Sequence, residues 1–578
     1  MTHAAGETAD AGTRRPSEPM APVLRARMRL PRDLQMQRLW YSLRQPMFRS
    51  AFYRWLLPGR VAGAPGPAIS SDIWPGNAER GSAIIQGIFA LGGQTIRDPA
   101  PIWDPVGATD PWREAVHGFD WLRDLRAVSG ESARRAAREL VGRWIADNGR
   151  WNPLAWRPDI AGRRLAAWIL HYDFLGAAGD AMFRGRLLVS IAQQASHLCR
   201  VLPAGLSGSD LLFAIGGLIH AGLVMPRGSA WMRRGVILLS HELERQILSD
   251  GCHCERSPSV HFEVLQLLVG LRVAFGTADH AVPEPISDAI ARMAPLLRFF
   301  EHGDGGLALF NDSNEEADWL IDMTLARAIP AQTGTKGLPP KEAPVGGFQR
   351  LAAGRTVILV DAGPPPLPGF DRHAHAGTLS FEMSVGKDRL IVNCGAHEGR
   401  GEWWTAQRAT AAHSALVVND TNACVFAADT GLVRGPTHVA CHRDESDGAT
   451  WLEMNHDGYA APYGVIHHRR LYLTGSGEDL RGEDRLAGDT PQPFVLRFHL
   501  HPDVNVSVAQ NAQAAILKLP GGGWWRMRAK GGAISLADSI YMGKRGEARR
   551  SQQIVVTADL QAKDSTVRWA ITKEAVGN

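Results

Sequence analysis

The strongest constraint on the fold is a change in the spacing of apolar residues near residue 346. From residue 110 to about residue 327, apolar side chains recur at positions i, i+3, i+4 and i+7, the period of an amphipathic α-helix. From residue 347 onward, short runs rich in β-branched and aromatic residues alternate with turn residues. The sequence therefore predicts an all-α half followed by an all-β half.

The helical half is a series of segments of similar length separated by Gly, Pro and Asn. Examples are PWREAVHGFDWLRDL, ESARRAARELVGRWIADN, IAGRRLAAWILHYDFLG and WMRRGVILLSHELERQIL. Consecutive amphipathic helices joined by short loops fit an α-solenoid or a closed helical toroid. The other half contains runs such as RTVILVDAG, TLSFEMSVG, RLIVNCG and PFVLRFHLHPD, which are typical of a β-sandwich or barrel.

Length and composition set the domain organisation. A chain of 578 residues exceeds what one hydrophobic core supports, and 45% apolar with 21% charged residues is the composition of an ordinary globular protein. We predict a start with a basic segment over residues 1–60, disordered to about residue 24, and a toroid over 61–327. A Pro- and Gly-containing linker is expected over 328–346, followed by an antiparallel sandwich over 347–578.

Residues 25–60 form a basic, aromatic stretch with helical spacing of its apolar residues. One interpretation is a helix that contacts a membrane surface or a polyanion. The other is a helix that packs on the main body with its Arg side chains directed outward. Pro31, Pro46 and Pro58 divide the stretch into short pieces, which favours the second interpretation.

Charge and targeting signals exclude some functional classes. A formal net charge of +4 suits several acidic partners equally, and no zinc-finger, leucine-zipper or ribonucleoprotein motif points to nucleic acid. The first twenty residues lack an apolar segment behind a basic one, so no secretory signal is predicted. No apolar run approaches the length of a membrane span. These features indicate a cytoplasmic protein, and nothing in the sequence indicates an oligomeric state.

The six cysteines are scattered along the chain and are predicted to be mostly buried free thiols. Cys252 and Cys254 flank His253, but the two-residue spacer usual between zinc thiolates is missing. We therefore expect no zinc site at this triplet.

Histidines concentrate at strand ends in the β half. His373 and His375 alternate ahead of a predicted strand, so their side chains are expected on one face. Asn393, Arg408 and His413 follow at the ends of later segments. Imidazoles gathered in this way fit a metal site or an acid-base site, and surface β positions remain the alternative for any one of them.

These segments resemble a known family. HAHAGTLSFEM, the strand ending LIVNCG, and RATAAHSALVV are similar to the sandwich motifs of the heparinase II/III branch of the polysaccharide lyases, and ERSPSVHFEVLQLL is similar to a helix start of that family. The resemblance covers roughly residues 110–570. It implies an incomplete (α/α) toroid followed by an antiparallel β-sandwich, and a carbon-oxygen lyase that cleaves an acidic, uronate-containing glycan by β-elimination. It also implies export to the cell envelope or periplasm.

The resemblance also implies roles for particular residues. His373 matches the catalytic histidine of the sandwich, and His375, Asn393 and His413 match the ligands of a structural metal, generally zinc. No organic cofactor is implied. Trp403 and Arg408 are expected to contact substrate.

The helical side departs from the family pattern. Position 393 is Asn where the family has Asp, and an amide is a poorer zinc ligand than a carboxylate. The family's Tyr falls on Val260, and its helical Asn-His pair falls near Ser209 and Asp210. Arg256 and His261 are the predicted substitutes, as neutraliser of the carboxylate and as proton donor, and a helix cap or a solvated face is the favoured alternative for each. His253 and Glu255 beside them are predicted to bind substrate.

Two rival functions remain open. A glycan-binding or envelope-assembly protein that kept the lyase scaffold and lost the acid accounts for Val260. A toroidal glycoside hydrolase would use the carboxylates that close the helical half, which are Asp304, Asp312, Glu315 and Glu316. The hydrolase interpretation leaves the histidines of the β half unexplained.

Overall fold

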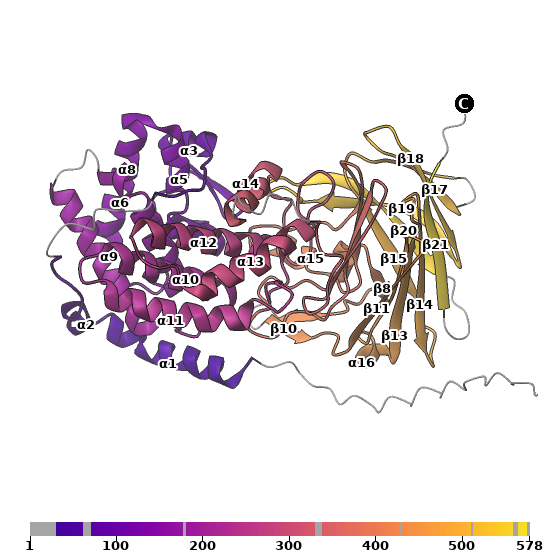
Figure 1. Ribbon diagram of the computed structural model, residues 1–578, viewed down its shortest axis with the longest axis horizontal. Coiled ribbons are helices and arrows are strands. Elements are labelled where there is room, and N and C mark those ends of the chain that lie inside the picture. The colour runs from indigo at the N-terminus through magenta and orange to yellow at the C-terminus, as the bar shows by residue number, and fades with distance from the viewer. Residues whose placement is uncertain are drawn as a thin grey trace, which may run out of the picture.

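The structure is a computed structural model that describes residues 30–61, 71–176, 181–329, 338–427, 431–509, 512–558 and 565–574. The start predicted to be disordered and residues 330–337 of the predicted linker lie outside the described residues. Helices and strands occupy separate halves of the molecule, with the helical half on the left of Figure 1 and the sheets on the right. The predicted fold class, a helical toroid followed by an antiparallel sandwich, is confirmed.

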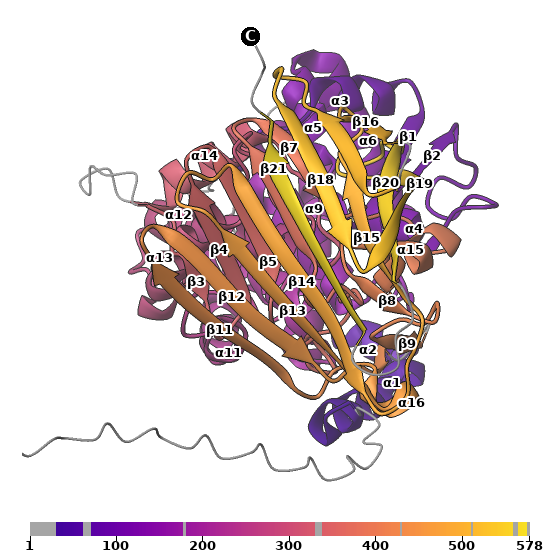
Figure 2. The ribbon, with the colours of Figure 1, turned by 90° about the vertical axis from the view of Figure 1, so that its right-hand side faces the viewer.

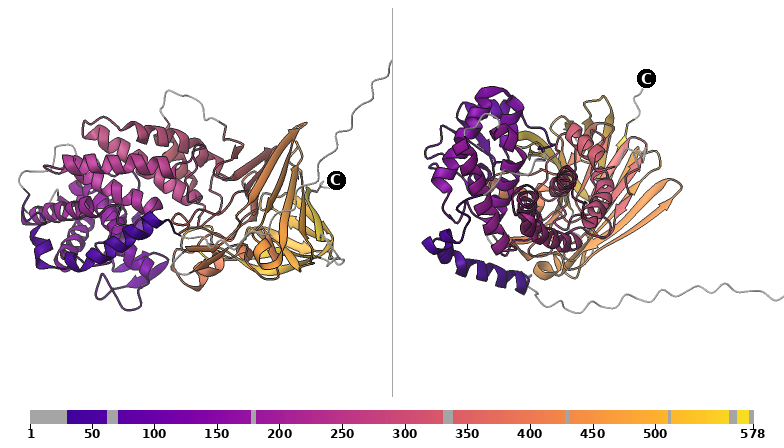
Figure 3. Two further views of the ribbon diagram at one scale, coloured as in Figure 1. Left: turned by 90° about the horizontal axis from the view of Figure 1, so that it is seen from below. Right: turned by 60° about the vertical axis from the view of Figure 1, so that its left-hand side comes forward.

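The helices of the first half are arranged around a common centre (Figure 3, right). Their bounds are α1 Arg32–Phe48, α2 Ala51–Trp55, α3 Ala78–Ile85, α4 Asp110–Gly118, α5 Leu122–Val128, α6 Gly130–Asn148, α7 Pro158–Leu170, α8 Tyr172–Gly176, α9 Ala181–Val201, α10 Gly208–Val224, α11 Ser229–Gln246, α12 Pro258–Thr277, α13 Glu284–Phe299 and α14 Asp318–Ala328. A short hairpin of β1 (Ile88–Leu91) and β2 (Gln94–Arg97) precedes α4.

Two helices show how the sequence sets their positions. α12 begins at Pro258, whose fixed φ suits a first helical turn, and the Ser257 side chain accepts a hydrogen bond from the Val260 amide. α10 packs against α7 where Gly217 meets Gly162, and a Cβ on Gly217 would lie 2.1 Å from the Gly162 carbonyl oxygen. Close backbone contact of this kind requires glycine, so these residues fix the centre of the toroid.

Among the described residues, one helix has the length and composition to cross a membrane. It is α12, and more than half of its apolar window is buried inside the toroid. A core helix of a large domain has the same composition, so α12 is accounted for by the helices around it.

The second half contains two antiparallel sheets. The nine-stranded sheet contains β19 Gly532–Tyr541, β20 Arg549–Ala558, β15 Phe494–Leu500, β7 Asp388–Val392, β6 Phe381–Val385, β5 Thr356–Asp361, β4 Phe348–Ala353 and β3 Glu342–Ala343 in spatial order, with β8 Leu416–Val418 beside β15. The eight-stranded sheet contains β11 Val439–Ser446, β12 Ala449–His456, β13 Val465–Leu473, β14 Asp479–Gly488, β21 Ser565–Lys573, β18 Trp524–Lys530, β17 Ala514–Lys518 and β16 Asn505–Val508.

The remaining elements of this half are short. They are α15 Glu402–Gln407, the 3-10 turn η2 Thr410–Ala412, β9 Val425–Ala427, β10 Gly431–Arg434 and α16 Ala460–Tyr463. α15 lies on the side of the sandwich that faces the toroid (Figure 1).

The two sheets enclose one hydrophobic core that contains Phe381 and Phe498 from the nine-stranded sheet and Trp569 from the eight-stranded sheet. The Phe381 ring stacks on the Trp569 indole with centroids 5.6 Å apart. Phe348 and Leu359 of the nine-stranded sheet instead join the core of the toroid. The nine-stranded sheet therefore faces the helices, and the eight-stranded sheet forms the far side of the molecule, as Figure 2 shows from that direction.

The junction between the halves is short. α14 ends at Ala328, and the sheet begins with Glu342 of β3, so the last residues of the predicted linker already form a strand and its turn. Arg256, directly before α12, crosses this junction and forms an ion pair with Asp361 of β5 at 2.5 Å. Both side chains are buried, so this pair ties the toroid to the sandwich.

The basic segment at the start forms α1 and α2, which lie along the outside of the toroid (Figure 1). One side of α1 packs on the main body, because Phe48 joins the core of the toroid and the buried Leu34 lies against Gly369 of the sandwich. Tyr53 of α2 is buried as well, and its hydroxyl lies 2.7 Å from Nδ1 of His197 on α9. These two helices thus pack on the main body.

Candidate active-site cleft between the toroid and the sandwich

A hollow of about 340 Å³ lies between the two halves, and we call it the cleft. His373 of the sandwich lines it, and Val260 and Ser209 line it from the toroid. A second hollow of about 440 Å³ shares Ser209 with the cleft and is also lined by Arg38 and Tyr41 of α1. We call it the side hollow. The cleft is where side chains from both predicted halves of the site come together.

His373 lies in the loop between β5 and β6 with about a quarter of its side chain exposed. Its Nδ1 forms a hydrogen bond with Asp312 Oδ2 at 2.9 Å, and its Nε2 lies 3.6 Å from Glu255 Oε2. Burial lowers the pKa of His373, but the hydrogen bond with Asp312 and the charge of Glu255 outweigh burial and raise the net pKa above the usual value. The imidazole is thus held between two carboxylates at the wall of the cleft.

Arg408, predicted to contact substrate, supports the loop that carries His373. Its side chain is buried, its Nε donates to the Ala374 carbonyl at 2.8 Å, and its guanidinium lies 4.3 Å from the centre of the Trp404 ring. Burial lowers the pKa of Arg408 to about 10. Arg408 therefore positions the loop, and it also lines the side hollow.

The predicted metal ligands are close together but differ in what they offer a metal. His375 Nδ1 lies 3.2 Å from His413 Nε2, and His413 Nδ1 donates to the Ala409 carbonyl at 2.8 Å. Asn393 Oδ1 accepts the Ser414 amide at 3.0 Å, which fixes the orientation of its side-chain amide. The atom left over is Nδ2, which has no hydrogen-bond partner among the described residues.

This donor set does not fit a structural zinc ion. Such a site takes four thiolate, imidazole or carboxylate ligands, whereas an amide nitrogen has no lone pair to give. Turning the Asn393 amide over would direct its NH2 group at the Ser414 N–H, two donors facing each other. Within the described ranges no group of three or more His, Cys, Asp or Glu side chains has the arrangement to hold a metal ion, and this includes the triplet at Cys252.

Arg256 and His261, the predicted neutraliser and proton donor, face away from the cleft. Arg256 is occupied by Asp361 and by the carbonyl oxygens of Gly346 and Pro364 at 2.7 and 2.6 Å. His261 is buried in the toroid, and its Nε2 donates to the Met293 carbonyl at 2.9 Å. Burial lowers the pKa of His261 to about 4, so its imidazole is neutral at neutral pH.

The predicted substrate-binding residues lie in three different environments. His253 is fully buried, with Nε2 3.1 Å from Gln246 Oε1, and burial lowers its pKa to about 3. Glu255 lines the side hollow, accepts the Ser209 amide at 2.6 Å and has a pKa raised by burial. Trp403 is about half exposed on α15, beside a smaller hollow. Of the three, Glu255 is the one near His373.

Ion pairs at the mouth of the cleft were not predicted from the sequence. Arg372, next to His373, binds the Asp210 carboxylate of α10 and lies 3.4 Å from Glu114 of α4. Arg157 binds the same Glu114 at 2.8 Å. Arg372 adjoins a motif residue, but nothing in the sequence indicates that partners 162 and 258 residues away would meet it.

Carboxylates outnumber guanidinium groups along the cleft. The arginines that line it are Arg157, Arg163, Arg372 and Arg545, and the acids are Glu114, Asp120, Asp159, Asp210, Glu263, Asp312 and Glu398. Arg545 is itself paired with Glu316 at 2.8 Å and Glu263 at 3.0 Å. A ligand in the cleft therefore meets a surface with more negative than positive groups.

The carboxylates proposed for a hydrolase do not form a catalytic pair. Asp304 binds Arg389 at 2.7 Å, and Asp312 binds His373. Glu315 accepts from the Tyr541 hydroxyl, and Glu316 binds Arg545. Each acid has its own partner in a different place, so the geometry gives no support to paired-acid hydrolysis.

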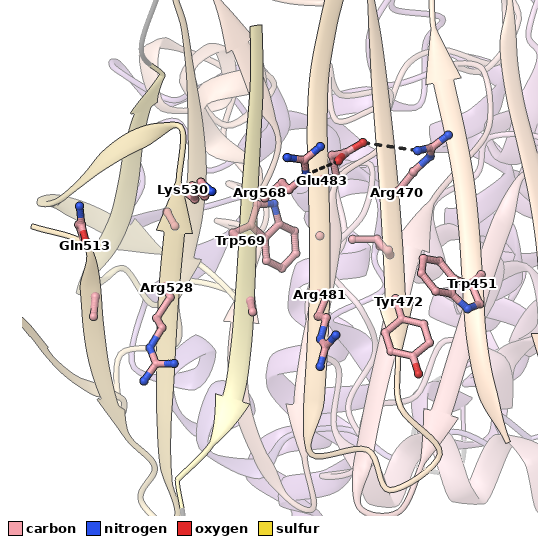
Figure 4. A pocket seen from close by; sticks show the side chains of 15 residues that line it. Trp451, Arg470, Tyr472, Arg481, Glu483, Gln513, Arg528, Lys530, Arg568 and Trp569 are labelled. Atoms are coloured by element: carbon pink, nitrogen blue, oxygen red, sulfur yellow. Dashed lines mark hydrogen bonds and ion pairs between the residues drawn. The ribbon is translucent and has the colours of Figure 1, made fainter. Parts of the chain in front are cut away.

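A further hollow is a groove of about 850 Å³ on the outer face of the eight-stranded sheet, which we call the outer groove. Figure 4 shows its side chains rising from neighbouring strands, with the rings of Trp451 and Tyr472 at one side and Arg528 and Lys530 at the other. Glu483 forms ion pairs with Arg568 and Arg470 at 2.6 and 3.5 Å. No imidazole is among the residues that line the groove, and it lies across the sandwich from His373.

A toroid of helices joined to an antiparallel sandwich, with a histidine loop in the cleft between them, is the scaffold of a class of polysaccharide lyases. Comparison with known families agrees. A family model described as the heparinase II/III N-terminus matches residues 104–329, and one described as heparinase II/III-like, C-terminal, matches residues 335–570. The chain belongs to the heparinase II/III family.

Similar proteins differ in what their names record. FtsZ-localized protein C of Caulobacter vibrioides is 31% identical over 536 residues, covering 87% of this chain and 89% of that protein. A heparin-sulfate lyase of Pedobacter heparinus is 23% identical over 362 residues, covering 54% of this chain and 52% of the lyase. The crystal structure of heparinase III has a TM-score of 0.73 at 15% identity, covering 95% and 93% of the two chains. That structural likeness establishes the shared fold.

Proposed function

We propose that this chain is a glycan-binding and envelope-assembly protein that uses the lyase scaffold without cleaving its ligand. The observation that carries the proposal is the toroid wall of the cleft. Val260 stands at the position of the family's Tyr and has no proton to exchange. Asp210, near the position of the family's helical pair, is occupied by Arg372.

β-Elimination from a uronate needs three groups at one sugar. One neutralises the carboxylate, one removes the adjacent proton and one protonates the leaving oxygen. His373 is placed to serve as one of them, with Asp312 as its partner. Arg256 and His261 do not line the cleft, so the two predicted substitutes supply neither of the other two groups.

The charge of the cleft supports a ligand other than a strongly acidic glycan. The excess of carboxylates beside His373 repels uronate and sulfate groups, and low-dielectric walls strengthen that repulsion. Hydroxyl and amide groups of a neutral or weakly charged glycan suit the same surface as hydrogen-bond donors. We therefore propose such a glycan as the ligand.

The relative from Caulobacter supports a role in cell division. Its name places that protein with FtsZ, and the match extends over most of both chains. We propose that this chain also acts at the division apparatus of the cell envelope. An envelope-associated position agrees with the expectation from the family.

A lyase is the second candidate, favoured by the His373 imidazole that lies at the cleft wall with Asp312 and Glu255 beside it. The two candidates differ in one product. Elimination creates an unsaturated uronate that absorbs in the ultraviolet, whereas binding creates none.

The first experiment measures that absorbance for wild type and His373→Ala with heparan sulfate, hyaluronan and alginate. The second measures binding of soluble peptidoglycan fragments by calorimetry. We expect no absorbance change, and binding of the fragments that Val260→Trp weakens by filling the cleft. Trp451→Ala in the outer groove is the matched control and should bind as wild type does. A rise in absorbance that His373→Ala abolishes would overturn the proposal in favour of the lyase.

A further inference from the structure

The outer side of α1 and α2 carries an uncovered apolar surface. Eight large apolar side chains of these helices and the turn after them are exposed, by between 39% and 79%: Met36, Leu39, Trp40, Leu43, Met47, Phe52, Trp55 and Leu56. We call them the α1–α2 apolar surface. Scattered single apolar residues are normal on proteins, but a contiguous group of this size marks a contact surface.

The five residues of this surface on α1 follow helical spacing. Met36, Leu39, Trp40, Leu43 and Met47 stand at i, i+3, i+4, i+7 and i+11, which places them along one side of the helix. The residues that pack on the main body stand on the opposite side, and they are Leu34, Arg38, Tyr41 and Phe48. α1 therefore has two apolar sides, and only one of them is buried by the fold.

The toroid holds the inner side firmly. Arg38 Nε donates to the Gly205 carbonyl at 3.1 Å, and Arg200 donates to the Leu56 carbonyl at 2.9 Å. The Phe48 ring lies 5.6 Å from Trp151 and 5.1 Å from His197. The exposed side is thus presented by a helix that is already fixed, so no refolding is needed to bring the apolar residues together.

The segment that carries the apolar surface is also basic. Six arginines lie on these helices and the turns that follow them, at positions 32, 38, 44, 49, 54 and 60, and all six residues are exposed, with Arg38 on the inner side. Asp33 is the one acidic residue between positions 30 and 61. None of the six guanidinium groups forms an ion pair with another residue in the described part of the chain. Uncompensated arginines beside exposed aromatic rings are suited to anionic headgroups above an apolar layer.

We infer that the α1–α2 apolar surface docks the protein on an anionic phospholipid bilayer, with both helices lying in the plane of the membrane. The inference stands apart from the proposed glycan ligand. Trp40 and Trp55 are amphipathic rings that favour the headgroup boundary, and the arginines contact lipid phosphates. A protein partner of matching shape would need acidic groups around an apolar centre, whereas a bilayer supplies both layers without a specific sequence.

The dimensions fit a surface contact and not a span. α1 has 17 residues, or about 25 Å of length, and one of its sides is bound to the toroid. It therefore lies along the membrane. Apolar burial supplies part of the binding energy and the arginines supply a part that salt screens.

The test is sedimentation of the full chain with vesicles of phosphatidylcholine alone or mixed with phosphatidylglycerol. We expect binding to the mixed vesicles, weakened by salt. The double substitution Trp40→Ser and Leu43→Ser should lower partitioning about tenfold or more, because each removes a large apolar side chain from the contact. Arg44→Gln with Arg54→Gln should lower binding to the mixed vesicles and remove part of its salt dependence.

The matched control replaces exposed apolar residues elsewhere on the toroid. Ile237→Ser and Trp319→Ser are 70% and 54% exposed on α11 and α14 and should partition as wild type does. Equal binding by Trp40→Ser/Leu43→Ser and wild type would overturn the inference. So would a wild-type dimer in light scattering that these two substitutions dissociate while no vesicle binding occurs, since the surface would then join two copies of the chain.

Discussion

The two walls of the cleft differ in how closely they match the family motifs that this sequence resembles. The sandwich wall keeps His373 at the surface and the pair of His375 and His413 behind it. The toroid wall has Val260 in the cleft, while Arg256 and His261 are engaged elsewhere. Chemistry that needs groups from both walls is lost when either wall changes, whereas a shape formed by both walls persists. This difference favours binding over elimination.

The largest effect we predict concerns Arg256. A structural role predicts a large loss of stability when its charge is removed, whereas a role in contacting substrate predicts a small one. Arg256→Met leaves Asp361 buried without its partner, and losing one member of a buried ion pair costs about 3–5 kcal/mol. Urea unfolding measures this loss. Arg470→Met, at a pair with Glu453 that is more than half exposed, is the control and should cost less than about 1 kcal/mol. A similarly small loss for Arg256→Met would return Arg256 to consideration as a substrate contact.

The next effect concerns pH and His261. The pKa of His261 is about 4 in the folded protein and about 6.5 in the unfolded chain, so below pH 6.5 the unfolded chain takes up a proton that the folded protein does not. The stability from this residue is present above the unfolded pKa and is lost as pH falls. Between about pH 7 and pH 5, wild type should lose about 2 kcal/mol more than His261→Gln. Urea unfolding at the two pH values measures this loss. An equal loss of unfolding free energy in the two proteins would show that the toroid does not hold His261 neutral.

A smaller effect concerns metal binding by the sandwich wall, at His375, Asn393 and His413. Asn393→Asp should direct a carboxylate oxygen at His375 and His413, and we expect it to raise zinc affinity about tenfold or more over wild type. Metal analysis after dialysis measures the ratio, and His413→Ala in the Asn393→Asp background should remove the gain. Wild type that already carries a full equivalent of zinc would contradict this account of the donor set.

The smallest effect concerns the ion pair across the mouth of the cleft. Arg372 and Asp210 are partly exposed, so Arg372→Gln should change the free energy of unfolding by less than about 1 kcal/mol. Urea unfolding again measures it. A loss as large as that of Arg256→Met would mean that the mouth of the cleft and the junction hold the halves together equally.

The sequence predicted the succession of the halves because their apolar periods differ, but it concealed two central elements. α10 is apolar on every side, so no polar stripe marks it as a surface helix. Buried and exposed residues alternate along β14, but its buried positions include Gly482 and Asp484. The sequence of β14 therefore lacks the apolar alternation that marks a strand. Asp484 is accommodated because it binds Arg469 at 2.7 Å, a contact that only the folded sheet creates.

Site prediction had the same limit. Short motifs placed His373, His375 and His413 together because strand ends and loops of one sheet are local features. Arg256 and His261 lie in a motif as well, but their contacts with Asp361 and Met293 join distant parts of the chain. Which way a polar side chain turns at a helix start depends on such partners, and spacing along the chain does not reveal them.

α1 belongs to two environments at once. Arg38 and Tyr41 on its inner side line the side hollow, and Trp40 and Leu43 on its outer side face away from the protein. A rigid helix cannot move one side without the other. A ligand in the side hollow and a membrane bound at the outer side therefore act on the same helix. By thermodynamic reciprocity, any influence of the first on the second equals the influence of the second on the first. α1 thus provides a physical connection through which binding in the side hollow and binding at the outer side of α1 can affect each other.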